Sequence, residues 1–350
     1  MNLARIARPE ILGLAPYAHA SWEPALTRLH ANENPWRDAD DASLTGLNRY
    51  PEPEPAALEA RLAALYGVAA DELLAARGSD EAIDLLTRVF LCPGKDAALI
   101  CPPTFGMYAV AARIQGASVI EVPLVRERGF ALDEAGLGRA LEGPVKLIFI
   151  CTPNNPTGHE TDPGSIERLA ARVAGRALVV VDEAYAEFAG TGSLATRIKR
   201  LPNLVVLRTL SKAYALAGAR VGALIADASV VELARRVRPP YSIATPCTEA
   251  ALAALAPAPL ARARARIELI RSERTKLAAA LARLPLVRRV WPSAANFLLV
   301  ESEDAAALLA RARAAGFLLR DFSQGALTPG AVRISVGTPE DNARLVGSLA

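Results

Sequence analysis

The sequence predicts an α/β protein, with a large domain built on a mostly parallel central sheet flanked by helices and a smaller α+β domain. Between about residues 75 and 225, apolar runs of strand length alternate with stretches of helical pattern. These runs are continuous in Val, Ile and Leu, which is typical of strands covered on both faces. In the last hundred residues, a long region rich in Ala, Arg and Leu precedes short strands and helices. The two patterns indicate two domains of different architecture.

The elements of the large domain follow from these runs in order. A helix over GSDEAIDLLTRVF (78–90) is expected to be capped by Ser79 or Asp80 and to end at the turn CPGKD. MYAVAARIQG forms the next helix, stopped by Gly116, and SIERLAARVAG forms a third. The expected strands are AALIC (97–101), ASVIEVPL (117–124), KLIFICT (146–152), ALVVVDEAY (177–185) and LVVLRTL (204–210).

The smaller domain is predicted over residues 241–350, after a large domain over 40–240. Its strands are expected in NFLLVE, FLLRDFS and AVRISVG, with a helix in DAAALLARARAAG. The final helix has a clear start, because Thr338 can cap it, Pro339 suits its first turn and Asp341 completes a capping box. The segment before residue 40 shows little regular pattern, and we expect it to pack on the smaller domain or on a partner chain.

The composition describes a folded globular chain, since 52% of its 350 residues are hydrophobic and only 22% are charged. The formal charge is +3, and the arginines near residues 262–274 are scattered around a helix, which predicts a solvated face and no nucleic-acid partner. Four cysteines without CxxC spacing or partnering histidines predict free thiols and no metal site. No apolar run approaches the roughly 18 residues of a membrane span, so we expect a soluble, cytoplasmic protein.

Polar residues terminate several of the predicted strands. Asp182 ends the run VVVD, Thr209, Ser211 and Lys212 follow LVVLR, TPNNPTG follows another strand, and GSDE opens a helix. Ligands of doubly wound sheets bind beyond the carboxyl ends of the strands, so these groups are expected to face one crevice. Each of them has a structural explanation of its own, as a turn, a cap or a surface lysine. Their joint position at strand ends indicates a ligand site.

One ligand accounts for this set of groups. A lysine in apolar surroundings, such as Lys212 in TLSKAYALAGARVG, loses its charge easily and can form a Schiff base. Arg220, together with hydroxyls and helix-end amides, suits a phosphate. Asp182, largely desolvated after three valines, needs a cationic partner such as a protonated pyridine nitrogen. The set describes pyridoxal 5'-phosphate (PLP).

Nine motifs, in order along nearly the whole chain, carry a resemblance to a known family. The sequence resembles the fold type I PLP-dependent aminotransferases of the class II family, and among them those that act on histidinol phosphate. The resemblance implies a homodimer whose active sites are shared between the subunits. The motifs are LHANENP (29–35), NRYP (48–51), RGSDE (77–81), PPTFGMY (102–108), NNPTG (154–158), VDEAY (181–185), TLSKAYALAGARVG (209–222), LLRD (318–321) and VRISVGTPE (332–340).

The resemblance implies a role for each matching residue around the cofactor. Lys212 would hold PLP as a Schiff base and shuttle a proton between the substrate Cα and the cofactor C4′. Asp182 would pair with the pyridine nitrogen, while Asn155 and Tyr185 would hydrogen-bond the 3-oxygen of the ring. Phe105 would stack on the ring at a position where the family often has Tyr. The implied phosphate ligands are Gly78, Ser79, Asp80, Thr209, Ser211, Arg220 and, from the second subunit, Tyr50.

The same resemblance assigns the substrate side. Arg333 in VRISVG matches the family arginine that takes the carboxylate of glutamate or 2-oxoglutarate. Arg320 in LLRD matches the position associated with the substrate phosphate, and Tyr17 and Asn34 match N-terminal residues that line the pocket. Without the family, both arginines are simply surface residues of edge strands. The implied reaction belongs to histidine biosynthesis: L-glutamate and imidazole-acetol phosphate give 2-oxoglutarate and L-histidinol phosphate.

Other activities share nearly all of these cofactor residues. One is an aromatic or broad-specificity amino acid aminotransferase. Another is a PLP lyase that resembles threonine-phosphate decarboxylase and breaks the bond between Cα and the carboxylate. A phosphate-binding Arg320 favours the transfer to imidazole-acetol phosphate. A PLP-binding regulator is disfavoured, because no DNA-binding module is appended.

Overall fold

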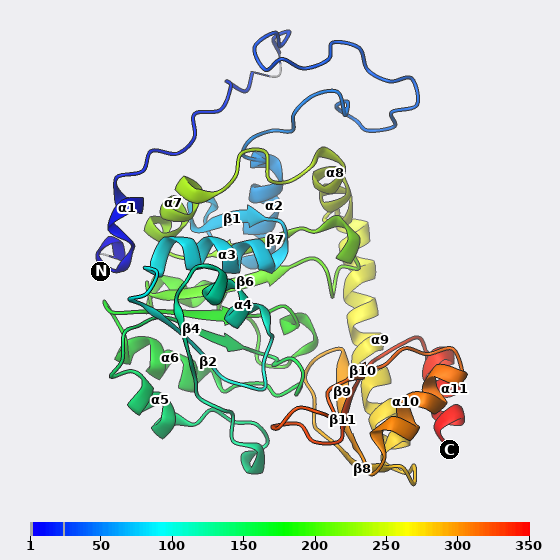
Figure 1. The fold of residues 1–350 in the computed structure, drawn as a ribbon. Coiled ribbons are helices and arrows are strands. Elements are labelled where there is room, and N and C mark those ends of the chain that lie inside the picture. Colours follow the sequence, from blue (N-terminus) through cyan, green and yellow to red (C-terminus); the bar gives the residue numbers. More distant parts are fainter. Residues whose placement is uncertain (1–2, 24) are drawn as a thin grey trace.

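Two sheets organise the chain in the computed structural model, which describes residues 3–23 and 25–350 (Figure 1). The larger sheet has the strand order β1-β7-β6-β5-β4-β2-β3. The pairs among β2 to β6 are all parallel, whereas β7 runs antiparallel to both β6 and β1. The mostly parallel sheet predicted from the sequence is confirmed. Its strands are β1 Leu73–Ala76, β2 Ala97–Ile100, β3 Ser118–Glu121, β4 Val145–Cys151, β5 Leu178–Asp182, β6 Leu204–Thr209 and β7 Gly222–Ile225.

Helices cover both faces of this sheet, as its continuous apolar strands require. Every residue of β5 and β6 is buried, and the two sides of the sheet belong to two separate hydrophobic cores. One core includes α2 (Ala56–Tyr66), α5 (Glu134–Ala140) and α6 (Pro163–Arg172), and the other includes α3 (Gly78–Phe90), α4 (Met107–Ile114) and α7 (Ala228–Val237).

The smaller domain is a four-stranded antiparallel sheet with helices packed on it. The long helix α9 leads from the large domain to this sheet (Figure 1). The predicted cap of the last helix is present, because the Thr338 side chain accepts a hydrogen bond from the Asp341 amide. The elements are α8 Thr245–Ala254, α9 Pro257–Leu281, β8 Val287–Val290, β9 Phe297–Ser302, α10 Ala305–Ala314, β10 Arg320–Asp321, β11 Ala331–Ser335 and α11 Pro339–Leu349.

The N-terminal segment lies on the large domain at its start. A 3-10 turn (Leu3–Ile6) and α1 (Pro9–Leu12) bury Leu3, Ile6 and Ile11 in the core formed with α3 and α7. These first residues therefore do not pack on the smaller domain, contrary to expectation. Beyond α1 the chain makes a long excursion without helix or strand before it reaches α2 (Figure 1). Packing of this excursion on a partner chain stays a prediction.

The helix α3 covers the predicted residues, but its start is not capped as predicted, and this matters for the site. The helix begins at Gly78, so Ser79 and Asp80 lie inside its first turn and do not cap it. No described side chain caps the helix, and the Glu81 carboxylate instead accepts a hydrogen bond of 2.7 Å from the amide of Arg77, the residue before the helix. Among the described residues, no helix is both long and apolar enough to cross a membrane.

Candidate active site

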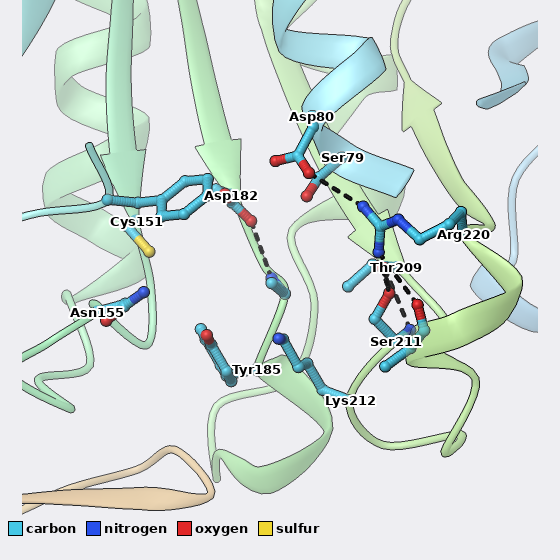
Figure 2. A pocket seen from close by; sticks show the side chains of 13 residues that line it. Ser79, Asp80, Cys151, Asn155, Asp182, Tyr185, Thr209, Ser211, Lys212 and Arg220 are labelled. Carbon is cyan, nitrogen blue, oxygen red and sulfur yellow. Dashed lines mark hydrogen bonds and ion pairs between the residues drawn. The ribbon is translucent and has the colours of Figure 1, made fainter. Parts of the chain in front are cut away.

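A pocket with about 550 Å³ of empty space opens at the carboxyl ends of β4, β5 and β6, next to the start of α3 (Figure 2). It is the crevice that the polar strand ends predict. The four groups of strand-end and helix-start residues converge here, although they are spread over residues 78–212 of the sequence. The pocket is lined by Ser79, Asp80, Phe105, Cys151, Asn155, Asp182, Ala184, Tyr185, Thr209, Ser211, Lys212, Ala217 and Arg220.

One end of the pocket is built to hold an anion. The first turn of α3 presents backbone amides there, because the first amides of a helix have no partner within it. The Arg220 guanidinium lies across this helix start and donates to the Ser211 hydroxyl at 3.3 Å and to the Asp80 carboxylate at 3.0 Å (Figure 2). The Thr209 hydroxyl donates to Ser211 at 2.9 Å. Guanidinium, hydroxyls and amides together fit a phosphate group.

Two backbone features bring Arg220 against the helix start. Arg220 adopts the left-handed conformation, with φ of 53°, as does Gly78, with φ of 76°. A Cβ at Gly78 would stand 2.8 Å from the Arg220 Nη2, so a larger residue there would displace the guanidinium from this position. Gly222, at the start of β7, is equally tight, since its Cβ would lie 2.9 Å from the Gly78 Cα.

Asp182 lies in the interior of the site, at the end of β5. It is 3% exposed, and burial raises the pKa of its carboxyl to about 6, above the usual value of 3.8. Its Oδ1 accepts from the Ala184 amide at 3.1 Å and its Oδ2 accepts from the Tyr108 hydroxyl at 2.7 Å. Tyr108 was not assigned a role from the sequence; the signal was present, since it closes the motif PPTFGMY.

Lys212 follows β6 and points its amine into the pocket (Figure 2). Burial lowers the pKa of this amine, and the positive charges of Arg333 and Arg220 lower it further. The Nζ lies 5.8 Å from the centre of the Tyr185 ring. An amine with a lowered pKa is available as a nucleophile and as a base closer to neutral pH.

The remaining wall of the pocket consists of aromatic and amide side chains. Tyr185 is buried and meets the Phe297 ring edge-on at 5.1 Å. Phe105 meets the Tyr108 ring at 5.6 Å, also nearly at right angles. Asn155 lies in the loop after β4, where its side-chain oxygen accepts a hydrogen bond from Arg333. Arg333 belongs to the smaller domain, so both domains meet at this pocket.

Arg320 and Arg333 face each other on neighbouring strands. They are register partners in the pair β10–β11, and both guanidinium groups lie near the Phe322 ring, at 5.8 and 5.6 Å. Arg333 is half-buried, and this burial lowers its pKa. Arg320 is exposed. Two cations held side by side by a sheet register suit a substrate with two anionic groups.

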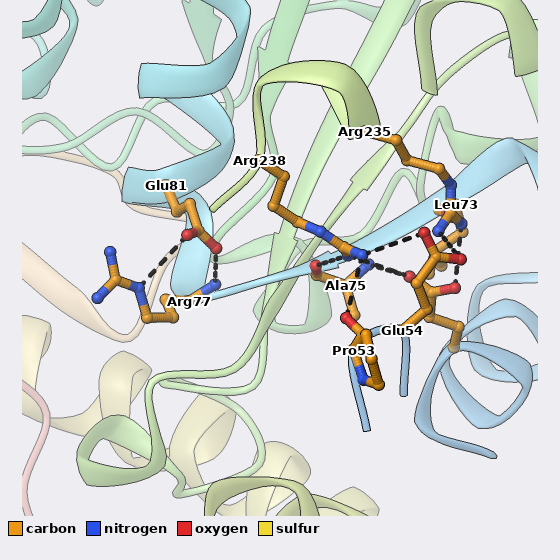
Figure 3. A network of polar contacts seen from close by, with 9 residues as sticks. Pro53, Glu54, Leu73, Ala75, Arg77, Glu81, Arg235 and Arg238 are labelled. Carbon is orange, nitrogen blue, oxygen red and sulfur yellow. Dashed lines mark hydrogen bonds and ion pairs between the residues drawn. The ribbon is translucent and has the colours of Figure 1, made fainter. Parts of the chain in front are cut away.

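Gly78, Arg320 and Arg333 do not themselves line the pocket, and three further predicted site residues lie apart from it in the N-terminal excursion. Tyr17 and Tyr50 are 67% and 50% exposed, and Asn34 is exposed and accepts a hydrogen bond from the Trp36 amide. Tyr50 is nevertheless well held, since its ring stacks on Tyr241 at 4.6 Å. The chain just after it is fastened by a network in which Arg235 and Arg238 bind Glu54 (Figure 3).

These groups fit PLP. The anion-binding end has the donors that a phosphate ester needs, and Gly78 leaves the space that this end requires. Asp182 is a buried carboxylate that forms no ion pair with any residue the structure describes, so a protonated ring nitrogen would supply its missing counter-charge. Lys212 has the lowered pKa that attachment to a carbonyl group requires.

Comparison with known proteins gives one family and several relatives. The family model for aminotransferase class I and II matches residues 28–349. A histidinol-phosphate aminotransferase of Stenotrophomonas maltophilia (strain R551-3) is 48% identical, with 100% of this chain and 97% of the relative covered.

Solved structures share the fold. A histidinol-phosphate aminotransferase from Sinorhizobium meliloti, in complex with pyridoxal-5'-phosphate, has a TM-score of 0.76 at 23% identity and covers 86% of this chain and 82% of its own. An L-threonine-O-3-phosphate decarboxylase from Porphyromonas gingivalis has a TM-score of 0.74 at 26% identity, with 87% and 90% covered.

Proposed function

The chain belongs to the class I and II aminotransferase family, and on that premise we propose that it acts as a histidinol-phosphate aminotransferase. It is a PLP-dependent enzyme, and the amino group would pass from L-glutamate to imidazole-acetol phosphate, giving 2-oxoglutarate and L-histidinol phosphate. The observation that carries the choice of substrate is the register pair of Arg320 and Arg333 beside a PLP-type pocket. The similarity to a histidinol-phosphate aminotransferase over the whole chain, at 48% identity, supports this choice.

The residues that would hold the cofactor divide into two groups. Gly78, Ser79, Asp80, Thr209, Ser211 and Arg220 would bind the phosphate, and Asp182, Asn155, Tyr185 and Phe105 would hold the ring. When bound, PLP supplies an electron-withdrawing ring that makes the proton on the substrate Cα acidic.

Lys212 would carry that proton. Its amine points into the pocket, and its pKa is lowered by partial burial and by the positive charges of Arg333 and Arg220. A neutral amine at this place could take the proton from the substrate Cα and deliver it to the cofactor C4′, which is the role that the family resemblance implies for Lys212. Asp182, kept ionised by two hydrogen bonds, would stabilise positive charge on the ring nitrogen.

The two arginines would select the substrates. Arg333 would bind the α-carboxylate of glutamate, held against Asn155 and the Phe297 ring, 5.3 Å from its guanidinium carbon. Arg320 would bind the phosphate of the second substrate. Both substrates would use the same pocket in turn, which is a ping-pong order: glutamate leaves as 2-oxoglutarate before imidazole-acetol phosphate enters.

The proposal includes a homodimer. Tyr50, Tyr17 and Asn34 belong to an exposed excursion that carries further exposed apolar side chains, among them Leu29, Trp36 and Leu44. A second copy would cover these groups and receive the Tyr50 hydroxyl at its own phosphate site. Sedimentation of the purified protein tests the dimer, and a monomeric active enzyme would contradict it. A cytoplasmic location is proposed from the four free cysteines.

Half-reactions followed through the cofactor spectrum test the function. The PLP-loaded enzyme is mixed separately with histidinol phosphate, phenylalanine and O-phosphothreonine, with Lys212→Ala as the inactive control. We expect histidinol phosphate to convert the cofactor fastest and at the lowest concentration. A preference for phenylalanine would indicate the aromatic aminotransferase. Release of carbon dioxide from O-phosphothreonine would indicate the lyase, which the structural likeness to a decarboxylase keeps as second candidate.

A further inference from the structure

Tyr108 does not line the pocket, but it contacts the Asp182 carboxylate, which does line it. Tyr108 lies on α4 and is fully buried, and its hydroxyl donates to the Asp182 Oδ2 at 2.7 Å. Among the described residues, it is the only side chain that donates a hydrogen bond to this carboxylate. The other oxygen is served by the Ala184 backbone amide.

The surroundings of Asp182 otherwise oppose its negative charge. Burial raises the pKa of its carboxyl, and the charges of Asp80 and Glu183 raise it further, whereas the bonds from Tyr108 and Ala184 lower it. Burial and the neighbouring Asp182 raise the pKa of the Tyr108 hydroxyl, so it remains a donor throughout the working pH range. The titratable and charged groups that act on these two are Asp80 from α3, Cys151 from β4, Tyr185 and Glu183 after β5, and Lys212 after β6.

The ring of Tyr108 is itself held on both sides. It stacks on Phe149 of β4, with ring centres 4.8 Å apart and planes at 5°. Its edge contact with Phe105 places it behind the side chain predicted to stack on the cofactor ring. Since an offset or edge-on aromatic contact fixes both partners, a shift of Tyr108 would move Phe105 as well.

We infer that Tyr108 is a positioning residue for the cofactor ring: its hydroxyl keeps Asp182 ionised and aimed into the pocket, while its ring fixes Phe105. Tyr108 thereby positions two residues that would contact the cofactor ring: Asp182 at its nitrogen and Phe105 on its face. The inference rests on the assignment of Asp182 to the ring nitrogen, which is part of the proposed function. It is independent of which amino acid is the substrate.

Tyr108→Phe tests this role, because it keeps the ring between Phe149 and Phe105 and removes only the hydroxyl. We expect the dissociation constant of PLP from the apo-protein to rise about 5- to 20-fold, the size of effect that one lost charge-assisted hydrogen bond produces. In the loaded enzyme, kcat should fall by a similar factor, with the KM for glutamate changed by less than about 2-fold. The acid limb of the kcat/KM profile should move to higher pH, because Asp182 loses a donor that favours its charged form.

The matched control is Tyr66→Phe, which removes another buried tyrosine hydroxyl, outside the pocket. It should leave the PLP dissociation constant and the acid limb unchanged. A structural role for the Tyr108 hydroxyl would change the thermal unfolding of the apo-protein but not the acid limb. Both variants are measured on the folded fraction after gel filtration.

A double-mutant cycle with Asp182→Asn separates the possible outcomes. If Tyr108 acts through the carboxylate, Tyr108→Phe should change the PLP dissociation constant by less than about 2-fold in the Asp182→Asn background. An equal loss in both backgrounds, or an unchanged acid limb in the single variant, overturns the positioning role. If Asp182→Asn alone leaves PLP binding unchanged, the assignment of Asp182 to the ring nitrogen fails, and the inference fails with it. The half-reactions with different amino acids remain a separate test of the substrate.

Discussion

Neighbouring residues of the site differ in chemistry because their surroundings differ. Asp182, the last residue of β5, and Glu183, which follows it, are about equally buried, yet their carboxylates contact different partners. Glu183 meets the buried Arg208 guanidinium at 2.7 Å, which supplies its counter-charge. Asp182 receives only neutral donors, so burial leaves the pKa of its carboxyl at about 6. Asp182, which forms no ion pair with a described residue, lines the pocket, where a bound cation could supply its counter-charge.

A first prediction concerns the stability of the apo-protein as a function of pH. The pKa of Asp182 is raised from 3.8 to about 6 in the folded state, so its ionisation costs stability as the pH rises through this range. Asp182→Asn carries no such cost. The variant should therefore gain stability relative to the parent between about pH 4 and pH 7, measured by thermal unfolding without PLP. A difference that stays constant with pH would contradict the raised pKa.

A second prediction concerns the arginine pair. Arg320→Ala should lower kcat/KM for histidinol phosphate by about 10- to 100-fold, since a charge-assisted contact to phosphate is lost. The value for glutamate should fall by less than about 3-fold, because Arg333 remains. Arg313→Ala, an exposed arginine of α10, is the control and should leave both values unchanged. Equal losses for both substrates would show that Arg320 does not recognise the phosphate.

At the scale of elements, the ends of helices and strands assemble the site. The start of α3 supplies amides to the anion site only because the helix begins at Gly78, with Glu81 accepting from the preceding amide. The parallel strands β4, β5 and β6 deliver their following residues to the same edge. The antiparallel β7 returns beside β6, and this return brings Arg220 back to α3.

Gly78→Ala tests the close approach of α3 and Arg220. The added Cβ would lie 2.8 Å from the Arg220 Nη2, which must move away from the anion site. We expect the dissociation constant of PLP, measured by fluorescence quenching, to rise by about 5- to 10-fold. The left-handed backbone should also cost about 1–2 kcal/mol of stability.

Gly94→Ala is the matched control for this change. Gly94 has a similar φ of 67°, but its Cβ would meet nothing within 4 Å. It should lose comparable stability and keep its PLP affinity. If Gly94→Ala weakened PLP binding as much as Gly78→Ala, the steric explanation would be wrong.

For the whole molecule, the important contact is the one between the two domains. Arg333 crosses from the smaller sheet to Asn155 of the large domain. The second contact between the domains is made by the Glu301 carboxylate on β9, which is 2% exposed. It accepts hydrogen bonds from Arg126 at 2.6 Å, from Arg288 at 2.8 Å and from the Trp291 indole at 2.5 Å. Arg126 belongs to the large domain, so this network holds the sheet that carries Arg320 and Arg333 against it.

Glu301→Ala should therefore affect stability and catalysis together. Removing the carboxylate leaves the buried Trp291 indole without its acceptor and two partly exposed arginines without their counter-charge, which should cost about 2–3 kcal/mol in the free energy of unfolding. Urea denaturation measures this loss, and the KM for glutamate should rise because Arg333 is less well placed. Glu303→Ala is the control, since Glu303 is exposed two residues away and should change stability by less than about 0.5 kcal/mol. An equal loss of stability in both variants would show that the hydrogen bonds of Glu301 do not stabilise the contact between the domains.

The sequence by itself determined the fold class and the class of chemistry. Val/Ile/Leu runs identify strands covered on both sides, and the rule that parallel strands end at one edge places Asp182, Thr209 and Lys212 together. Both inferences depend on local properties of the chain, namely the apolar pattern of each strand and the residues that directly follow it.

The tertiary structure alone decided the rest. The Tyr108–Asp182 bond and the opposition of Arg320 and Arg333 join segments whose register is set by packing. Packing also placed the first residues on the large domain, because Leu3 and Ile11 complete the apolar surface of α3 and α7. No local pattern encodes such partners, since each contact depends on the side chains that the rest of the fold brings to it.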